Sequence, residues 1–477
     1  MRTSRFMTLT SIVALLAACG GGGSDSGGSA PPVAAVPTPT PTQSTAGCSL
    51  RERQDWAAGE LREWYLFPEL LPASLDASAY ASVETYIDGL TATARAQSKD
   101  RFFTYLTSIA AENAFYDLGV SAGFGMRLSY DSGAGRLFVA ETFEGTAALD
   151  AGIDRGTEIL AIGTSATTLR TVASIFAAEG SAGVSAALGP SEPGVTRVLR
   201  VRSGGVDRDV SVTKVNYEIQ PVSTRYGAKV INDGGGQVGY LNLRTFISTA
   251  DPQLRAAFDS FRSQGITRVI VDLRYNGGGL VSIADLMGNL MGAGRANNVF
   301  SYTTFRPEKA SNNRTTLFTP QSQSIAPVKI AFIGTRGTAS ASELVINSFT
   351  PYLRANSALI GTNTYGKPVG QVALDRSACD DRLRVVAFKT ENANRQGDYY
   401  TGLASTVEAS CQAGDDLSHA FGDPAESSIK AALDFLAGRS CTPIAAGGTQ
   451  TTQSLRGREL LQQSRPTTAE REVPGLH

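Results

Sequence analysis

Residues 328–349 constrain the fold of this chain of 477 residues more than any other stretch. The apolar run Val-Lys-Ile-Ala-Phe-Ile at 328–333 is typical of a strand, and Leu-Val-Ile-Asn-Ser-Phe at 344–349 fits a helix. Residues 337–343 between them are Gly-Thr-Ala-Ser-Ala-Ser-Glu, whose small side chains permit a sharp turn. A helix start also leaves unpaired backbone N–H groups that point at whatever lies there. The stretch therefore predicts a strand, a turn and a helix that present a hydroxyl for attack, with Ser340 as the nucleophile.

Ser342 is the rival nucleophile. Two residues further along a helix it faces about 200° away from Ser340, so only one of the two can face a base. Glu343 follows in the first helical turn, and we interpret it as a residue that suits the helix dipole rather than as a catalytic acid.

The chain contains only two histidines, which restricts the choice of base. His477 is the last residue of a polar segment, so a Ser-His-Asp triad has one realistic candidate, His419. A zinc site built on histidines is equally disfavoured, and we expect neither a metal nor a cofactor. Lysine is the usual substitute for histidine in serine chemistry.

The bulk properties limit the partners and the number of domains. The length predicts two or three domains. A net charge of −1, with no basic stripe that carries interleaved aromatic residues, gives no reason to expect nucleic acid.

Residues 1–18 are interpreted as a targeting segment, since two arginines precede an apolar run and Leu-Ala-Ala precedes Cys19. These small residues resemble the lipobox of bacterial lipoproteins, which implies cleavage before Cys19 and its acylation. An ordinary signal peptide cut nearby is the alternative. Because Gly20 rather than an aspartate follows, we expect a lipid anchor in the outer membrane that faces the periplasm of a bacterial cell envelope. Residues 19–47 would be a flexible linker.

Four further cysteines, Cys48, Cys379, Cys411 and Cys441, would meet an oxidising compartment after export, where disulfides are permitted. Three connectivities are possible. We favour Cys379–Cys411, which flank one β-rich stretch, and Cys48–Cys441, which bracket the folded part. Free buried thiols are the alternative, and a zinc site is disfavoured because no Cys-x-x-Cys occurs.

Residues 48–112 show aromatic and aliphatic side chains at helical spacing and predict a helical region. Residues 113–217 change to five strand-like runs with glycine-rich turns and resemble a PDZ domain. The resemblance implies that Gly123, Phe124, Gly125 and Met126 form the loop whose N–H groups bind a peptide C-terminus. The strand after this loop would then take up the peptide by β-augmentation.

From residue 218 to 440 the pattern becomes α/β, with a nearly continuous apolar strand at 267–273, as expected for a sheet that is covered on both faces. Arg-Tyr-Asn-Gly-Gly-Gly follows at 274–279. A glycine run between a buried strand and a helix lets the backbone approach a ligand closely. Two interpretations remain open on these residues, a phosphate cradle and half of an oxyanion hole.

Three motifs in series, at 272–279, 338–343 and 361–371, resemble the signatures of the C-terminal processing peptidases, also called tail-specific proteases. The resemblance covers about residues 48–436. It implies an α/β protease core with crotonase/ClpP-like ββα units, an inserted or preceding PDZ domain and an N-terminal helical region.

The same resemblance assigns roles to single residues. Ser340, rather than Ser342, is the nucleophile, Lys367 is the general base and Gln371 orients the lysine. The N–H group of Ala341, with that of Gly277 or Gly278, would hold the oxyanion.

The physics of a lysine base agrees with these roles. A lysine takes a proton from serine only when burial lowers its pKa. Residues 363–371 contain no carboxylate that would oppose this, and Gln371 offers a neutral hydrogen bond.

Two stretches mimic other motifs. Gly361, Gly366 and Lys367 have the spacing of a P-loop, but Pro368 replaces the hydroxyl that binds magnesium, so we expect no nucleotide. Residues 427–430 have the sequence Ser-Ser-Ile-Lys, which matches the S-x-x-K signature of penicillin-binding proteins. No Lys-Thr-Gly accompanies it, and a helix surface is the favoured interpretation.

The leading hypothesis is a serine endopeptidase with a Ser-Lys dyad, which cleaves proteins or peptides recognised by apolar C-terminal tails and is anchored to the lipid bilayer through Cys19. The alternative is a non-catalytic PDZ binding or scaffold lipoprotein with a degenerate protease core. Residues 441–477 are polar and are expected to be a disordered tail.

Overall fold

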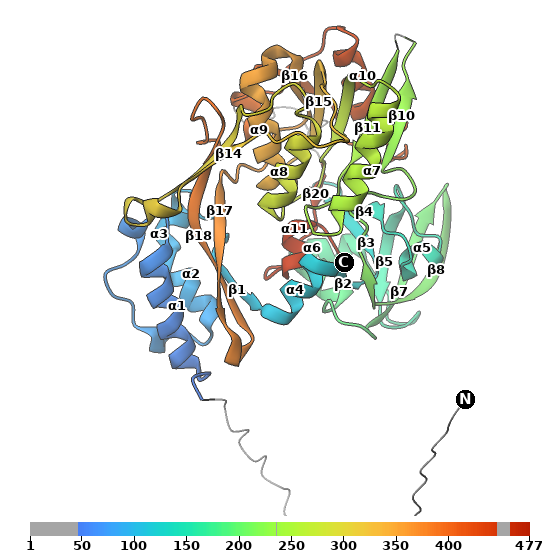
Figure 1. Ribbon diagram of the computed structural model, residues 1–477. Coiled ribbons are helices and arrows are strands. Elements are labelled where there is room, and N and C mark those ends of the chain that lie inside the picture. The colour runs from blue at the N-terminus through green and yellow to red at the C-terminus, as the bar shows by residue number, and fades with distance from the viewer. Residues whose placement is uncertain (1–45, 235, 446–457) are drawn as a thin grey trace, which may run out of the picture. The chain divides into compact units, whose positions relative to one another are not determined.

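The computed structural model describes residues 46–234, 236–445 and 458–477 (Figure 1). At its centre lies a six-stranded sheet in the order β10-β11-β12-β15-β16-β19, parallel except for β10 at one edge. The strands are β10 (Ala228–Asn232), β11 (Gln237–Asn242), β12 (Arg268–Asp272), β15 (Lys329–Gly334), β16 (Ser357–Gly361) and β19 (Ala409–Gln412). The chain is therefore a mixed α/β protein, as the alternation of strand and helix patterns predicted.

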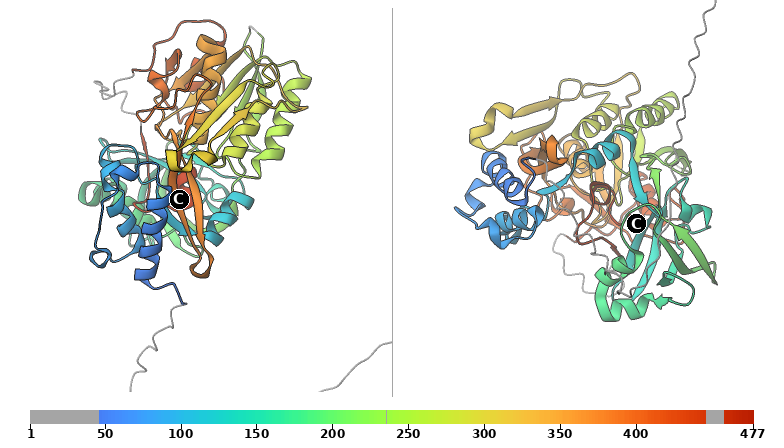
Figure 2. Two further views of the ribbon diagram at one scale, coloured as in Figure 1. Left: turned by 60° about the vertical axis from the view of Figure 1, so that its left-hand side comes forward. Right: turned by 90° about the horizontal axis from the view of Figure 1, so that it is seen from below.

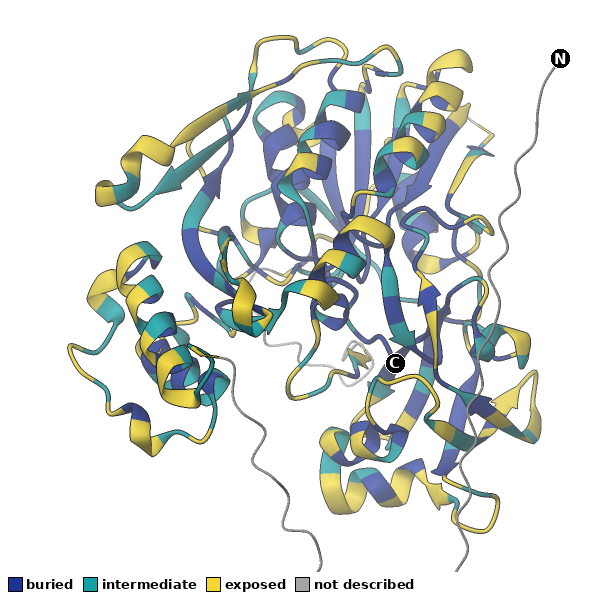
Figure 3. Ribbon diagram, turned by 60° about the horizontal axis from the view of Figure 1, so that its bottom comes forward, coloured by how far each residue is buried: buried dark blue, intermediate teal, exposed yellow. Residues whose placement is uncertain are grey.

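Helices cover both faces of this sheet. Helices α7 (Ala250–Ser263), α8 (Val281–Leu290) and α9 (Ala341–Leu353) pack on one face, and α10 (Ser427–Leu436) packs on the other (Figure 1). Successive side chains of β12 point to opposite faces, so Val269 and Val271 join the core under α7–α9 while Ile270 joins the core under α10. The inner strands are buried and the outer helix surfaces are exposed (Figure 3).

A second sheet has the order β1-β18-β13-β14, with β17 paired to β18. Its strands are β1 (Tyr105–Ser108), β13 (Val299–Phe305), β14 (Arg314–Leu317), β17 (Val369–Arg376) and β18 (Asp381–Glu391). The helices of the N-terminal region are α1 (Leu50–Trp64), α2 (Val83–Leu90) and α3 (Ala92–Ala96). They share one hydrophobic cluster with β17 and β18 (Figure 2).

Residues 120–218 form the β module. Its strands are β2 (Val120–Gly123), β3 (Met126–Asp131), β4 (Arg136–Thr142), β5 (Glu158–Gly163), β6 (Arg170–Thr171), β7 (Thr196–Ser203), β8 (Val206–Thr213) and β9 (Val215–Glu218). Helix α4 (Ile109–Leu118) precedes it, and α5 (Ala147–Asp150) and α6 (Val172–Leu188) lie within it. Its main sheet has the order β20-β3-β4-β5-β7-β8, with β6 on β5, so a strand from the end of the chain takes the edge beside β3.

That edge strand belongs to the tail segment, residues 458–477. The tail segment contains β20 (Glu459–Leu460) and α11 (Thr468–Glu472), so the prediction of a disordered tail over residues 441–477 is wrong for these residues. Leu461, Val473 and Leu476 are at most 2% exposed because existing apolar clusters receive them. A few apolar residues in a polar stretch were enough to order it.

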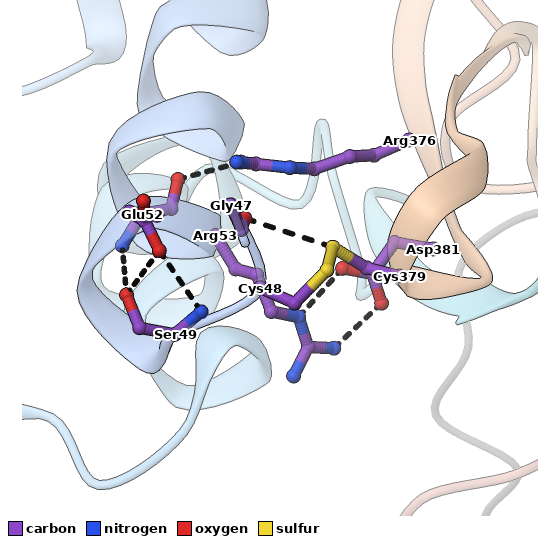
Figure 4. The surroundings of a disulfide bond; sticks show 8 residues. All are labelled: Gly47, Cys48, Ser49, Glu52, Arg53, Arg376, Cys379 and Asp381. Atoms are coloured by element: carbon purple, nitrogen blue, oxygen red, sulfur yellow. Dashed lines mark hydrogen bonds and ion pairs between the residues drawn. A yellow bond between two sulfur atoms is a disulfide. The ribbon is translucent and has the colours of Figure 1, made fainter. Parts of the chain in front are cut away.

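The favoured disulfide pairing is also wrong. Cys48 pairs with Cys379, and Cys411 pairs with Cys441. The turn between β17 and β18 lies at the start of α1, where Arg53 forms an ion pair with Asp381 (Figure 4). The chain after α10 returns beside β19, since Gln412 N–H donates to the Thr442 carbonyl. Cys19 lies outside the described residues.

In the part of the chain that the structure describes, no helix is both long and apolar enough to cross a bilayer.

A buried ionic network joins the β module to the central sheet. The guanidinium of Arg244, which follows β11, lies 2.6 Å from carboxylate oxygens of Glu141 and of Glu144. Arg127 on β3 also donates to Glu141, at 3.1 Å. Burial alone would raise the pKa of Glu141, but the two guanidinium groups lower it to about 2. The network therefore stays charged at neutral pH.

Replacing the central cation should destabilise the protein. We expect Arg244→Met to lower the free energy of unfolding by about 3–5 kcal/mol, because buried carboxylates lose their compensating charge. Urea denaturation measures the loss. Adding Glu141→Gln should restore part of it, whereas Arg200→Met, at an exposed ion pair with Asp209, should change little. A double variant no more stable than Arg244→Met alone would show that the carboxylate of Glu141 is not the source of the loss.

Candidate active site

The turn between β15 and α9 holds Ser340 in an unusual conformation. Its φ is 54° and its ψ is −115°, a backbone geometry that non-glycine residues rarely adopt unless their surroundings enforce it. Two hydrogen bonds hold this turn against the loop after β12. Thr338 Oγ1 donates to the Leu273 carbonyl at 2.7 Å, and Ala339 N–H donates to the Asn276 carbonyl at 3.0 Å. The predicted strand, turn and helix are confirmed.

The structure separates the two serines. Ser342 is fully buried, and its Oγ donates to the Asn276 carbonyl at 3.1 Å. Ser340 is only partly buried and begins the helix. Ser342 is thus part of the packing between α9 and the loop after β12.

Residues 276–279, the glycine loop, lie against this turn. A Cβ added to Gly278 would lie 2.8 Å from the Cβ of Ser340 and 3.2 Å from the Ala341 nitrogen, so a side chain there would displace the serine. The N–H group of Gly278 donates to Oδ1 of Asn276 at 2.9 Å, whereas that of Gly277 donates to the Glu472 carbonyl at 2.9 Å. The N–H group of Gly278 is therefore bonded within its own loop, whereas the N–H group of Gly277 points at the tail segment.

Lys367 precedes β17 and sits in a largely apolar setting. Its Nζ donates to Oε1 of Gln371 at 3.0 Å and lies 5.0 Å from the centre of the Phe103 ring. Gln371 is held in turn, because its Nε2 donates to the Phe103 carbonyl at 2.5 Å. Burial lowers the pKa of Lys367 from its ordinary value of 10.5. Burial therefore makes the neutral amine easier to reach than in an exposed lysine.

Glu343 joins the serine turn to the lysine strand. Its Oε2 accepts from the backbone N–H groups of Ser340 at 3.0 Å and Lys367 at 2.7 Å, and its Oε1 accepts from that of Gly366 at 2.7 Å. Burial raises the pKa of Glu343, and these hydrogen bonds oppose the rise. The sequence interpretation of Glu343 as a helix-start residue missed this link. The Ser-x-x-Glu spacing of a capping box was the available signal.

A cleft of about 2280 Å³ contains Lys367, Gly277 and Ala339 in its lining, together with residues of the tail segment. Sites for small ligands usually measure about 300–1,000 Å³. This cleft is larger than that range.

The other candidate residues lie in other settings. Nδ1 of His419 lies 2.7 Å from Oδ2 of Asp416, in the loop that precedes α10. Residues 427–430 belong to α10, where the exposed Lys430 pairs with Asp434 at 3.2 Å. In the stretch that mimics a P-loop, the N–H groups of Gly366 and Lys367 donate to a carboxylate rather than facing an anion site. Among the described residues, no cluster of three or more His, Cys, Asp or Glu could hold a metal ion.

The loop at residues 123–126 in the β module also contacts the tail segment. The N–H groups of Gly125 and Met126 donate to the His477 carbonyl oxygen at 3.1 and 3.3 Å. A Cβ on Gly123 would lie 2.8 Å from the carbonyl carbon of His477. Phe124 instead points into the core of the module, where it is fully buried.

The central part of this chain is similar to known proteins. Residues 237–401 match the model of peptidase family S41. A probable CtpA-like serine protease of Staphylococcus epidermidis is 27% identical over 180 residues, which are 38% of this chain and 33% of that protein. The chloroplastic C-terminal processing peptidase of Tetradesmus obliquus is 27% identical over 277 residues, 54% of each chain. For the chloroplastic carboxyl-terminal-processing peptidase 1 of Arabidopsis thaliana, the identity is 30% over 256 residues, 53% of this chain and 48% of that one.

The chain thus spans between a third and about half the length of these curated relatives. A crystal structure of a Bacteroides fragilis protein described as an S41 protease superposes with a TM-score of 0.60 at 22% identity, over 80% of this chain and 97% of that one. The two proteins share a fold. Residues 237–401 of this chain are thus similar to peptidase family S41.

Proposed function

We propose that this protein is a serine endopeptidase in which Ser340 and Lys367 form a catalytic dyad and cleave polypeptides through an acyl-enzyme. One observation carries the proposal: a single carboxylate oxygen of Glu343 binds the backbone N–H groups of both residues at 3.0 and 2.7 Å. The two residues, 27 positions apart in the sequence, are thereby brought to one place beside a cleft that Lys367 lines.

The chemistry follows from these positions. The neutral amine of Lys367 takes the proton of Ser340 Oγ as the oxygen attacks a carbonyl carbon. Backbone N–H groups of Gly277 and Ala341 stabilise the oxyanion, and Gly277 is preferred over Gly278 because the latter already donates to Asn276. The ammonium then protonates the leaving amine, and a water molecule activated by the same lysine releases the acyl group.

We also propose a recognition role for the β module. It would be a PDZ domain that precedes a crotonase/ClpP-like core and holds the apolar C-terminal tail of a protein substrate along β3. Support comes from the loop at 123–126, whose N–H groups donate to a carbonyl oxygen, and from the edge of β3, which pairs with an extended segment.

A place in the cell envelope completes the proposal. The protein would be anchored through an acylated Cys19 in the outer membrane and face the periplasm. Two disulfides in the described part of the chain suit an oxidising compartment of this kind.

Substitution of the dyad should abolish proteolysis. We expect Ser340→Ala and Lys367→Arg each to lower kcat/KM on an unfolded protein by about 10³-fold or more, because arginine stays protonated and alanine cannot attack. Ser342→Ala is the matched control and should keep most of the activity. If Ser340→Ala degrades the substrate as fast as the unmodified chain, a non-catalytic binding protein becomes the better assignment.

The activity should rise with pH as Lys367 loses its proton. Because burial lowers the pKa of this lysine, the midpoint should lie below 10.5. The charges of Glu472 and Asp100 raise this pKa and those of Arg471 and Arg384 lower it. Gln371→Glu would place a carboxylate against Nζ, raise the pKa and move the midpoint to higher pH.

Kinetics of kcat/KM over a pH series test this expectation. Gln371→Met, which removes the hydrogen bond without adding charge, is the control for the loss of orientation alone. A profile that is flat from acid to alkaline pH in the unmodified chain would rule out a lysine base.

A further inference from the structure

The tail segment occupies the edge of β3 from Met126 to Tyr130. Glu459 and Leu460 pair antiparallel with Tyr130 and Ser129. Further along the same strand, Leu128 N–H donates to the Gly475 carbonyl at 2.8 Å and His477 N–H donates to the Met126 carbonyl at 2.9 Å. With the loop at 123–126 also bound to His477, these positions of the edge are not open to another peptide.

The same segment lines the cleft that Lys367 also lines. The Glu472 carbonyl accepts the N–H group of Gly277 at 2.9 Å, which is the donor assigned above to the oxyanion. A Cβ added to Gly277 would lie 2.3 Å from the Arg471 carbonyl oxygen, so the tail backbone lies directly on the glycine loop. A substrate carbonyl and the Glu472 carbonyl cannot both occupy this position.

Apolar contacts hold the segment in place. Ala469, Val473 and Leu476 are at most 7% exposed and pack in a cluster with Phe115 and Tyr116 of α4. Burial of such side chains stabilises the docked state by about 25 cal/mol per Å² of apolar surface. These contacts therefore favour a docked segment over a dissociated one.

The geometry at Glu472 is that of an obstruction and not of a substrate. Helix α11 ends at this residue, whereas β-augmentation and cleavage take a peptide in extended form. Glu472 is 6% exposed; its Oε1 accepts from the Tyr116 hydroxyl at 3.0 Å, and its Oε2 has no hydrogen-bond partner among the described residues. The charge of this carboxylate favours the protonated form of Lys367 more strongly than the nearby Arg471 opposes it.

We propose that residues 458–477 are a built-in inhibitor, which occupies the peptide groove along β3, covers the glycine loop in the active-site cleft and must leave before a polypeptide substrate binds. The proposal rests on the peptidase function proposed above. The inhibitor is a segment of the same chain, and this one segment blocks two sites that a substrate would need together.

Leu476→Asp in the full chain tests the proposal, because it places a charge in a cluster where Leu476 is 2% exposed. Leu317→Asp is the matched control, since the same substitution falls on an exposed position of β14. Gly475→Val is a second way to displace the segment: Gly475 has a φ of 85°, and an added Cβ would lie 2.9 Å from the Leu128 carbonyl oxygen. Removal of residues 458–477 is the third.

Two readouts separate this proposal from the peptidase assignment. The first is kcat/KM on an unfolded protein. The second is binding of a fluorescent peptide with the sequence of residues 468–477 to the same variants on a Ser340→Ala background. We expect Leu476→Asp and Gly475→Val to raise kcat/KM and to tighten peptide binding by about tenfold or more, which corresponds to a segment docked in at least nine molecules of ten.

If both substitutions and the truncation leave kcat/KM and peptide binding at the level of Leu317→Asp, the segment does not inhibit. If mass spectrometry shows that the unmodified chain loses residues 473–477 while the Ser340→Ala chain keeps them, the segment is a substrate and the proposal is wrong. If Ser340→Ala does not lower the activity of Leu476→Asp, the peptidase assignment fails, and the binding readout still decides whether the segment blocks the groove.

Discussion

The buried carboxylate of Glu343 is the interaction on which the site depends. Two loops meet there, the turn that carries Ser340 and the stretch that ends at Lys367. Three backbone N–H groups converge on the carboxylate and offset part of the cost of burying it. It also lies in the first turn of α9, where the helix dipole favours a negative charge. Removing it would leave three backbone N–H groups without this acceptor, on both sides of the proposed dyad.

The order of the strands explains why these loops are near one another at all. β12, β15 and β16 are neighbours and run parallel, so their carboxyl ends lie at one edge of the sheet. The glycine loop, the Ser340 turn and the loop before Lys367 follow these three strands in turn. Ligands of open α/β sheets bind outside the carboxyl ends of the strands, where loops from different parts of the sequence converge.

The elements around the site could be predicted because each depends on a local pattern. The apolar runs at 267–273 and 328–333 became β12 and β15, and the helical pattern at 344–349 lies within α9. The Cys48–Cys379 disulfide depends instead on the β17–β18 hairpin lying next to α1. The local sequence pattern does not contain that information. Glu343 was assigned to the helix start correctly, but its second role requires knowing that residues 366 and 367 return to the same place.

The tail segment was misjudged for a related reason. Its composition is polar, but Leu461, Val473 and Leu476 meet clusters that other elements had already built. An edge strand offers unpaired N–H and C=O groups to any extended segment, whatever its side chains. Ordering a polar segment therefore required a few apolar anchors and an open edge, and neither requirement can be read from the segment by itself.

The chemistry of Lys367 links the tail segment to the dyad. In the proposed mechanism the lysine acts as a base only while it is desolvated, and the cleft that it lines is also lined by residues of the segment that obstructs the glycine loop. When the segment leaves, the charge of Glu472 leaves with it, and so does part of the cover over the amine. A bound polypeptide then has to supply that cover. In the proposed mechanism, deprotonation of the base is thereby coupled to occupation of the cleft by substrate.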